Sequence, residues 1–209
     1  MDNKMIFNSI NDILLNEKQP SIKIMQLINE GKLEKEPFNK IKKMQQIDQN
    51  KKYHPEGNVL NHTLLVVDRA SENKEKSKDK NVFMWSALLH DIGKLTTTRN
   101  NKGRITSYNH DVDGEKIAKD FLDEINEDIE FNIKVSKLVR WHMQPLFYKK
   151  NLPYFKPQNM INDVEYKEVA LLSLCDRLGR GNKDIEYIKE TVESIAKFEK
   201  HCEKIIGGS

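Results

Sequence analysis

Apolar residues recur at helical spacing along almost the whole chain, and strand-like alternation of apolar and polar residues is nearly absent. Such spacing is typical of amphipathic helices that bury one face. The 9 glycines and 6 prolines are few and fall mainly between the apolar runs, where loops would join the helices. The pattern therefore predicts an all-α fold.

The periodic runs give the expected helices. Loops are expected at 51–57, 72–81 and 93–110, and the last of these contains the turn Asn100-Asn101-Lys102-Gly103. We divide the chain into an N-terminal helical segment, 1–50, packed on the core, and a domain over 51–206 that carries the chemistry. The predicted helices cover residues 3–16, 21–30, 37–47, 58–73, 82–90, 111–123, 127–144, 158–178 and 184–206.

Charge and composition exclude several classes of protein. The 35 basic and 32 acidic residues give a net charge of +3, which is too balanced to indicate nucleic-acid binding by bulk charge. No apolar run reaches the ~18–20 residues that span a bilayer, and the N-terminus lacks the apolar core of a signal peptide. Cys175 and Cys202 show no paired spacing, as expected of reduced thiols. We expect a cytoplasmic protein without a membrane partner.

A His-Asp pair at the end of an apolar helix is the main chemical signal. The run over 82–90 leads directly into His90 and Asp91, and Gly93 follows. Ionisable groups are costly in such surroundings unless they are paired or bound to a metal. Asp176 repeats the pattern, because it also follows an apolar helix. Both acids are candidates for a site between the helices.

Three further histidines, in or at the ends of predicted helices, complete a candidate metal set. Imidazole and carboxylate bind Fe, Mn, Co, Ni and Zn alike, so the ligand types do not select one divalent ion. Six ligands are too many for one tetrahedral ion and suit two ions that share a carboxylate, for which Asp91 is the natural bridge. The predicted metal ligands are His62, His90, Asp91, His110, His142 and Asp176.

Several of these histidines also have a purely structural interpretation. A single histidine on an apolar helix, such as His62, is more often a satisfied core residue than a ligand. His110 suits the N-terminus of a helix without a metal, and His142 suits charge pairing at a helix C-terminus. Their order along the chain, together with the His-Asp pair, favours the metal interpretation.

Basic side chains near the predicted ligands are candidates for contacts with a phosphate. Lys94 follows the His-Asp pair by one helical turn and can contact a phosphate as a point charge; the alternative is a lysine that favours a helix C-terminus. We assign Asp91 and Lys94 as catalytic. Arg177 and Arg180 lie beside Asp176 and can contact substrate through two parallel hydrogen bonds, although Arg177 can equally form a salt bridge inside the fold.

His54 is the remaining candidate for substrate binding. It precedes a proline in a polar loop and either contacts the substrate or caps the fold. An aromatic-rich segment, 144–155, is predicted to be loop-like and also carries Lys149 and Lys150. Its side chains either pack in the core or form the wall of a nucleobase pocket by stacking. The aromatic residues concerned are Trp141, Phe147, Tyr148, Tyr154 and Phe155.

The ordered residues resemble the signature of the HD phosphohydrolase superfamily. That signature is a lone histidine, a His-Asp pair and a distal aspartate, which here are His62, His90-Asp91 and Asp176. Members with two metals add two histidines, matched by His110 and His142. The resemblance implies an HD-domain helical bundle with the metal site between helices.

A closer resemblance is to the HD domain of bacterial CCA-adding enzymes. The runs Tyr53–Asn58, Leu88–Lys94 and Asn109-His110 carry it, within a match over about residues 20–180. Two departures matter. The nucleotidyltransferase part of those enzymes has no counterpart in this sequence, and Asn58 stands where an acidic residue is usual.

The resemblance implies a metal-dependent phosphohydrolase that cleaves nucleotide or RNA-end phosphate esters, namely 2′,3′-cyclic, 2′- and 3′-phosphates, through a metal-activated water. Similar modules fused to polynucleotide kinases trim RNA ends, so the expected partner is a phosphorylated small molecule or an RNA 3′ end. The alternatives are a dinucleoside polyphosphate or deoxynucleotide hydrolase and a non-catalytic nucleotide-binding HD domain. Retention of every ligand favours an enzyme.

Overall fold

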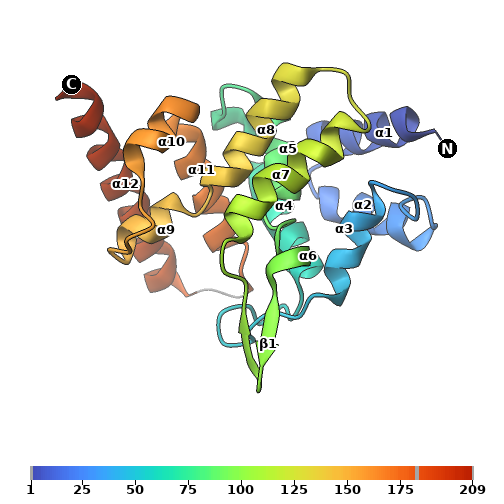
Figure 1. The fold of residues 1–209 in the computed structure, drawn as a ribbon, viewed down its shortest axis with the longest axis horizontal. Coiled ribbons are helices and arrows are strands. Elements are labelled where there is room, and N and C mark those ends of the chain that lie inside the picture. Colours follow the sequence, from blue (N-terminus) through green and yellow to red (C-terminus); the bar gives the residue numbers. More distant parts are fainter. Residues whose placement is uncertain (1, 182–183, 209) are drawn as a thin grey trace.

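The computed structural model describes residues 2–181 and 184–208 and confirms the all-α class, with one small hairpin added (Figure 1). The helices and strands follow one another in this order: α1 (Asn3–Asn16), α2 (Pro20–Asn29), α3 (Asn39–Lys43), η1 (Met44–Gln46), α4 (Val59–Asn73), η2 (Lys74–Lys76), α5 (Lys80–Leu89), α6 (Lys94–Thr97), β1 (Arg99–Asn101), β2 (Arg104–Thr106), α7 (His110–Asp123), α8 (Ile129–Trp141), α9 (Gln144–Lys149), α10 (Pro157–Asp163), α11 (Tyr166–Leu178) and α12 (Ile185–Gly207).

Helix α5 forms the centre of the bundle. Every residue from Val82 to Leu89 is buried, and the helix contacts α1, α4, α8 and α11. Its start is set by Asp79, whose side chain accepts hydrogen bonds from the backbone N–H groups of Asn81 and Val82, a cap worth about 1 kcal/mol. Because α5 is surrounded on all sides, the polar residues at its C-terminal end are also inside the protein.

Asn58 has a structural role as the N-cap of α4. Its Oδ1 accepts a hydrogen bond of 2.9 Å from the backbone N–H of Asn61. Asparagine and aspartate are equally good helix caps, so the amide in place of the usual acid is compatible with the same local fold. Helix α4 then carries His62 in its first turn, on the buried face.

The N-terminal helices pack against the two central ones. Helix α1 contacts α5, where the ring of Phe7 stacks on Trp85 at 4.9 Å and the Trp85 indole N–H donates to Asn11. Helix α2 contacts α4, and Asp68 accepts hydrogen bonds from the backbone and hydroxyl of Ser21. A domain boundary near residue 50 stays a prediction. None of the helices in the described residues combines the length and apolarity that a bilayer-spanning segment requires.

Three predicted segments differ from the observed ones. The helix expected over 158–178 is broken where Val164 adopts an extended conformation, which separates α10 from α11. The segment 144–155, expected to be loop-like, opens with α9, which has Pro145 in its first turn. The segment 93–110 contains α6 and the β1–β2 hairpin. Its two-residue turn, Lys102-Gly103, has positive φ at both positions, as a type I′ turn requires.

Candidate metal centre

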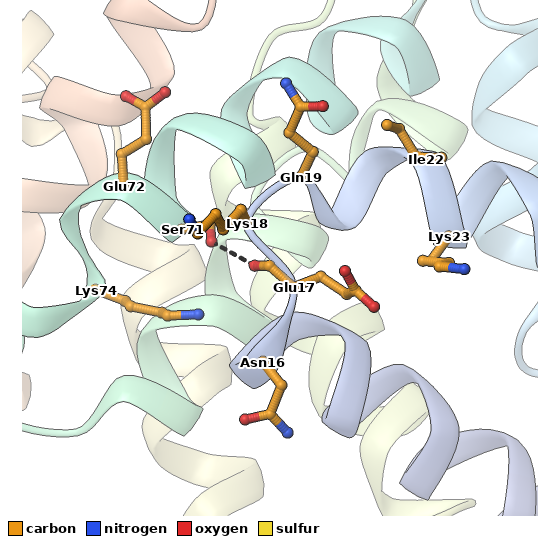
Figure 2. Close-up of a pocket in the computed structure, with 9 residues that line it drawn as sticks. All are labelled: Asn16, Glu17, Lys18, Gln19, Ile22, Lys23, Ser71, Glu72 and Lys74. Carbon is orange, nitrogen blue, oxygen red and sulfur yellow. Dashed lines mark hydrogen bonds between the residues drawn. The ribbon is translucent and has the colours of Figure 1, made fainter.

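A polar cavity of about 600 Å³ opens where the end of α5 meets α7 and α11. Its polar lining residues include Gln49, His54, Asp91, Lys94, His110, Asp176 and Arg180. A larger cavity of about 900 Å³ lies between the α1–α2 connection and the end of α4, where Ser71 donates to the Glu17 carbonyl at 2.8 Å (Figure 2). Within the described chain, no group of metal-ligating side chains lies there.

Close packing of α7 against the corner after α5 brings the predicted ligands together. A Cβ atom on Gly93 would lie 2.0 Å from the His110 carbonyl oxygen and 2.6 Å from the Gly114 nitrogen, so only glycine fits. Gly93 has an ordinary helical φ of −65°, and its role is therefore close approach rather than helix termination. This contact places the first residue of α7, His110, beside Asp91.

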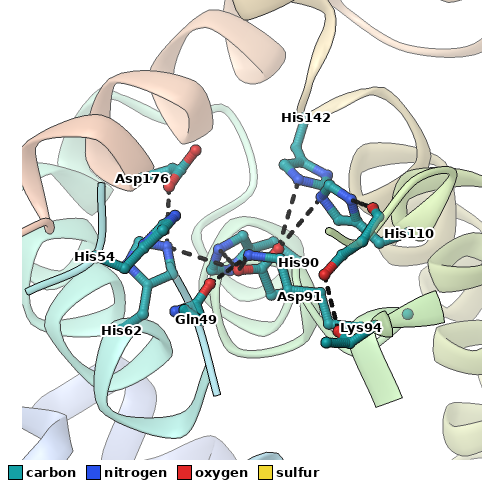
Figure 3. A network of polar contacts seen from close by, with 12 residues as sticks. Gln49, His54, His62, His90, Asp91, Lys94, His110, His142 and Asp176 are labelled. Carbon is teal, nitrogen blue, oxygen red and sulfur yellow. Dashed lines mark hydrogen bonds and ion pairs between the residues drawn. The ribbon is translucent and has the colours of Figure 1, made fainter. Parts of the chain in front are cut away.

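Asp91 lies between two pairs of histidines (Figure 3). Its Oδ2 atom is 3.7 Å from His62 Nε2 and 3.4 Å from His90 Nε2. Its Oδ1 atom is 3.4 Å from His110 Nε2 and 4.0 Å from His142 Nε2. Each half therefore offers two imidazole nitrogens and one carboxylate oxygen within 4.8 Å of one another.

Asp176 completes the first half of the cluster. Its Oδ1 atom lies 3.0 Å from His62 Nε2, across 114 residues of sequence. All six side chains predicted as ligands thus meet in one place, and each residue is buried to at least nine-tenths: His62, His90, Asp91, His110, His142 and Asp176.

Three of the histidines are oriented in the same way. The Nδ1–H groups of His90, His110 and His142 donate to the backbone carbonyl three residues earlier, at 2.9, 2.8 and 2.6 Å. This fixes the proton on Nδ1 and turns Nε2 toward Asp91. In the described residues, the buried Nε2 atoms of His90 and His142 have no hydrogen-bond partner. Buried imidazole nitrogens without a partner, next to a carboxylate, fit a divalent metal ion.

The charge states of the cluster also fit metal binding. Burial lowers the pKa of His142 to about 3, and burial also lowers the pKa of His110, so both rings are neutral. Burial acts in the same direction on His90, but the carboxylates of Asp91 and Asp176 outweigh it and raise the His90 pKa. Burial alone would raise the pKa values of the two carboxyl groups, yet nearby cations hold both well below their usual range.

Those cations include Lys94 and Arg180. Lys94 Nζ lies 2.6 Å from Asp91 Oδ2 and also donates to Gln49 Oε1 at 2.7 Å. Arg180 contacts both oxygens of Asp176 through Nη2, at 3.1 and 3.0 Å. Both side chains line the cavity, so they combine contact with the cluster and access to a bound molecule.

The structure does not bring Arg177 into this cavity. Its guanidinium is buried on the far side of α11, where Nη1 donates to the Ser194 hydroxyl of α12 at 3.4 Å. Consecutive residues on a helix point in different directions, which explains why Asp176 and Arg177 are separated. This position agrees with the interpretation of Arg177 as a residue inside the fold.

Sequence reasoning missed Glu56 as part of the site. Its Oε1 atom accepts a hydrogen bond from His54 Nδ1 at 2.9 Å and lies 2.9 Å from His62 Nδ1, although the second contact is poorly aligned for a hydrogen bond. The pKa of Glu56 is lowered, because these contacts outweigh its burial. Its proximity in sequence to His54 and His62 is a signal for such a role, but a polar loop suggests a solvated side chain. His54 lines the cavity, and its role as a substrate contact stays a prediction.

A helical bundle with a buried cluster of four histidines and two aspartates defines the class of protein, and comparison with known families agrees with it. A family model described as "HD domain" matches residues 59–181, more than half of the chain. The chain therefore belongs to the HD domain family, as its motifs predicted. This places it in a superfamily of metal-dependent hydrolases.

Curated relatives are multifunctional CCA proteins. The protein of Haemophilus influenzae (strain PittGG) is 26% identical over 197 residues, which cover 86% of this chain and 46% of the relative. The protein of Actinobacillus pleuropneumoniae serotype 5b (strain L20) is 32% identical over 74 residues, covering 35% of this chain and 18% of the relative. The chain thus spans less than half the length of these relatives.

Proposed function

We propose that this protein is a metal-dependent phosphohydrolase that cleaves phosphate esters of nucleotides or RNA ends, with 2′,3′-cyclic, 2′- and 3′-phosphates as substrates. The observation that carries the proposal is the position of Asp91, whose two oxygens face two separate histidine pairs. One carboxylate between two pairs of imidazoles is the arrangement that two ions sharing a ligand require.

The ligand set would divide between two ions. His62, His90 and Asp176 would hold the first, His110 and His142 the second, and Asp91 would bridge them. Divalent ions bound there would lower the pKa of a water molecule and offset charge on the phosphoryl oxygens.

The chain's own cations would act on the substrate. Lys94 and Arg180 both line the cavity, and each can turn from its carboxylate partner toward a phosphoryl oxygen. The Nδ1 atom of His54 is hydrogen-bonded to Glu56, so its Nε2 atom remains available to contact a ribose hydroxyl or a phosphate. The proposal that the substrates are nucleotide or RNA-end phosphates is supported by the resemblance to CCA-adding proteins.

The test is a hydrolysis screen of the protein loaded separately with Mn, Co, Ni, Zn and Fe. Substrates are a 2′,3′-cyclic nucleotide, the 2′-, 3′- and 5′-nucleotides, a dinucleoside polyphosphate, a deoxynucleoside triphosphate and bis(p-nitrophenyl) phosphate. We expect release of phosphate or opening of the cyclic ester with at least one ion. Asp91→Asn should abolish turnover, whereas Asp120→Asn, an exposed change on α7, should not. Full activity of Asp91→Asn would refute the proposed mechanism.

A further inference from the structure

We propose that a second cavity beside His110 binds the nucleotide unit next to the reacting phosphate, so that the preferred substrate is an oligonucleotide end and not a mononucleotide. This inference rests on the proposed function. The cavity has a volume of about 500 Å³ and adjoins the metal-site cavity. The two share six lining residues: Ser107, Tyr108, His110, Met143, Leu146 and Lys150. A nucleotide strand whose terminal phosphate lies at Asp91 can therefore extend toward the second cavity, which begins at His110.

The charge of this second cavity suits a phosphodiester. Lys150 lines both cavities and Lys156 lines the second; both are exposed, and within the described residues neither forms an ion pair. The carboxylate in the lining, Asp111, is neutralised by Arg140 at 2.6 Å. Two lysines without carboxylate partners thus remain as the uncompensated charge, and they attract an anion.

The aromatic residues of the 141–155 region divide between the core and this cavity. Tyr148 and Phe155 pack on Phe198 of α12, so they belong to the core. Phe147 and Tyr154 line the cavity instead, with ring centroids 5.7 Å apart, and Tyr154 is 58% exposed. Tyr108, another residue of the lining, is 68% exposed.

Exposed aromatic rings beside unpaired lysines match the chemistry of a single nucleic-acid strand. Bases stack on aromatic rings irrespective of sequence, and the linking phosphates contact the cations. A mononucleotide whose phosphate lies at the metal cluster offers one base and no second phosphate. It cannot use both the rings and the lysines, whereas a longer strand can.

The test compares a mononucleoside 3′-phosphate with a trinucleotide that ends in the same 3′-phosphate. We expect kcat/KM to be higher for the trinucleotide. Tyr154→Ala and the double variant Lys150→Ala/Lys156→Ala should each lower the trinucleotide-to-mononucleotide ratio by about fivefold or more. The matched control is Lys149→Ala, since the neighbouring lysine is paired with Glu190 at 2.7 Å on α12 and lines neither cavity. Its ratio should equal that of the wild type.

A binding measurement keeps this inference separate from the proposed function. The affinity of a fluorescent trinucleotide 3′-phosphate is measured by polarisation, in chelator, at several salt concentrations. The double lysine variant should bind more weakly, and its salt slope should be smaller by about one for each phosphate that the lysines no longer neutralise. Equal binding by wild type and double variant overturns the subsite, whatever the enzyme hydrolyses. Retained trinucleotide binding without any hydrolysis supports the subsite and contradicts the proposed function.

Discussion

At the scale of single residues, the four candidate ligand histidines are held in two ways. Three are tethered to the carbonyl of their own preceding turn, whereas His62 has the Glu56 carboxylate beside its Nδ1. A carboxylate next to Nδ1 keeps the ring proton there and leaves Nε2 available to a metal. Glu56 is therefore a positioning residue for His62.

Glu56→Gln should weaken metal binding by about 10- to 100-fold, because the amide no longer fixes the protonated Nδ1 of His62. The measurement is competition with a coloured chelator, which reports the affinity of each bound ion. Only one of two ions should be affected, since His110 and His142 are on the other side of Asp91. Glu127→Gln, in the exposed α7–α8 connection, is the control. Equal weakening of both ions would count against a local role for Glu56.

His142 should make the metal-free protein less stable in acid. Its folded pKa is depressed to about 3, far below the value of about 6.5 in the unfolded chain, so the unfolded state binds the proton preferentially between those pH values. Stability contributed by the neutral ring is present above pH 6.5 and is lost as the pH falls. From pH 7 to 5.5 the loss is about 1 kcal/mol. His90, whose pKa is raised, acts in the opposite direction.

The check is urea unfolding in chelator at pH 7 and pH 5.5, for wild type and His142→Gln. The variant should lose less stability on acidification, because it removes this one titration. His201→Ala, which changes a histidine on α12 outside the cluster, should follow the wild type. The same pH response in wild type and His142→Gln would be inconsistent with a neutral His142 in the folded state.

At the scale of helices, the position of α7 against the corner after α5 decides whether the two halves of the site meet. Gly93→Ala should destabilise the protein by about 3 kcal/mol, because its Cβ would overlap the backbone of α7. The measurement is the urea midpoint together with metal stoichiometry. Gly207→Ala is the matched control, since a Cβ there meets no atom within 4 Å. Normal stability of Gly93→Ala would show that α7 can move away at little cost.

Helical periodicity predicted the long elements well, since α1, α4, α7 and α12 begin and end within two residues of the expected positions. Periodicity did not predict the elements whose boundaries depend on contacts with other parts of the fold or that are too short to show a pattern. The break at Val164 follows Asp163, which accepts a hydrogen bond from the Trp141 indole of α8. Helix α9 was missed because a short amphipathic turn next to Pro145 resembles a loop in sequence. The hairpin has too few residues for alternation to be visible.

At the scale of the whole molecule, the candidate site joins segments that are distant in sequence. His62 and Asp176 are 114 residues apart, and their contact connects α4 with α11. Residue type and order along the chain indicated the six candidate ligands, because histidine and aspartate in apolar surroundings need a reason to be there. Glu56 and Gln49 carry no such signal, and only the folded arrangement shows that Glu56 lies beside the candidate ligand His62 and that Gln49 accepts a hydrogen bond from Lys94.

Because the candidate ligands come from several helices, a bound metal should stabilise the entire fold. An ion at 100 times its dissociation constant adds about 2.7 kcal/mol, or about 5–10 °C in Tm for a chain of this size. Thermal unfolding with Mn or Zn, before and after chelation, measures the shift. Asp91→Ala should remove most of it, and Asp120→Ala should retain it. A shift that survives in Asp91→Ala would place the bound ion elsewhere.

The carbonyl tethers of His90, His110 and His142 have a consequence for how ions enter. Each ring is fixed by a hydrogen bond to the chain itself, so its orientation does not depend on a bound cation. Capture then requires no ring flip and, for the neutral rings, no release of a proton. The side-chain entropy of these imidazoles is thus lost when the protein folds. Binding of an ion then requires only that imidazole nitrogens replace water molecules in its hydration shell.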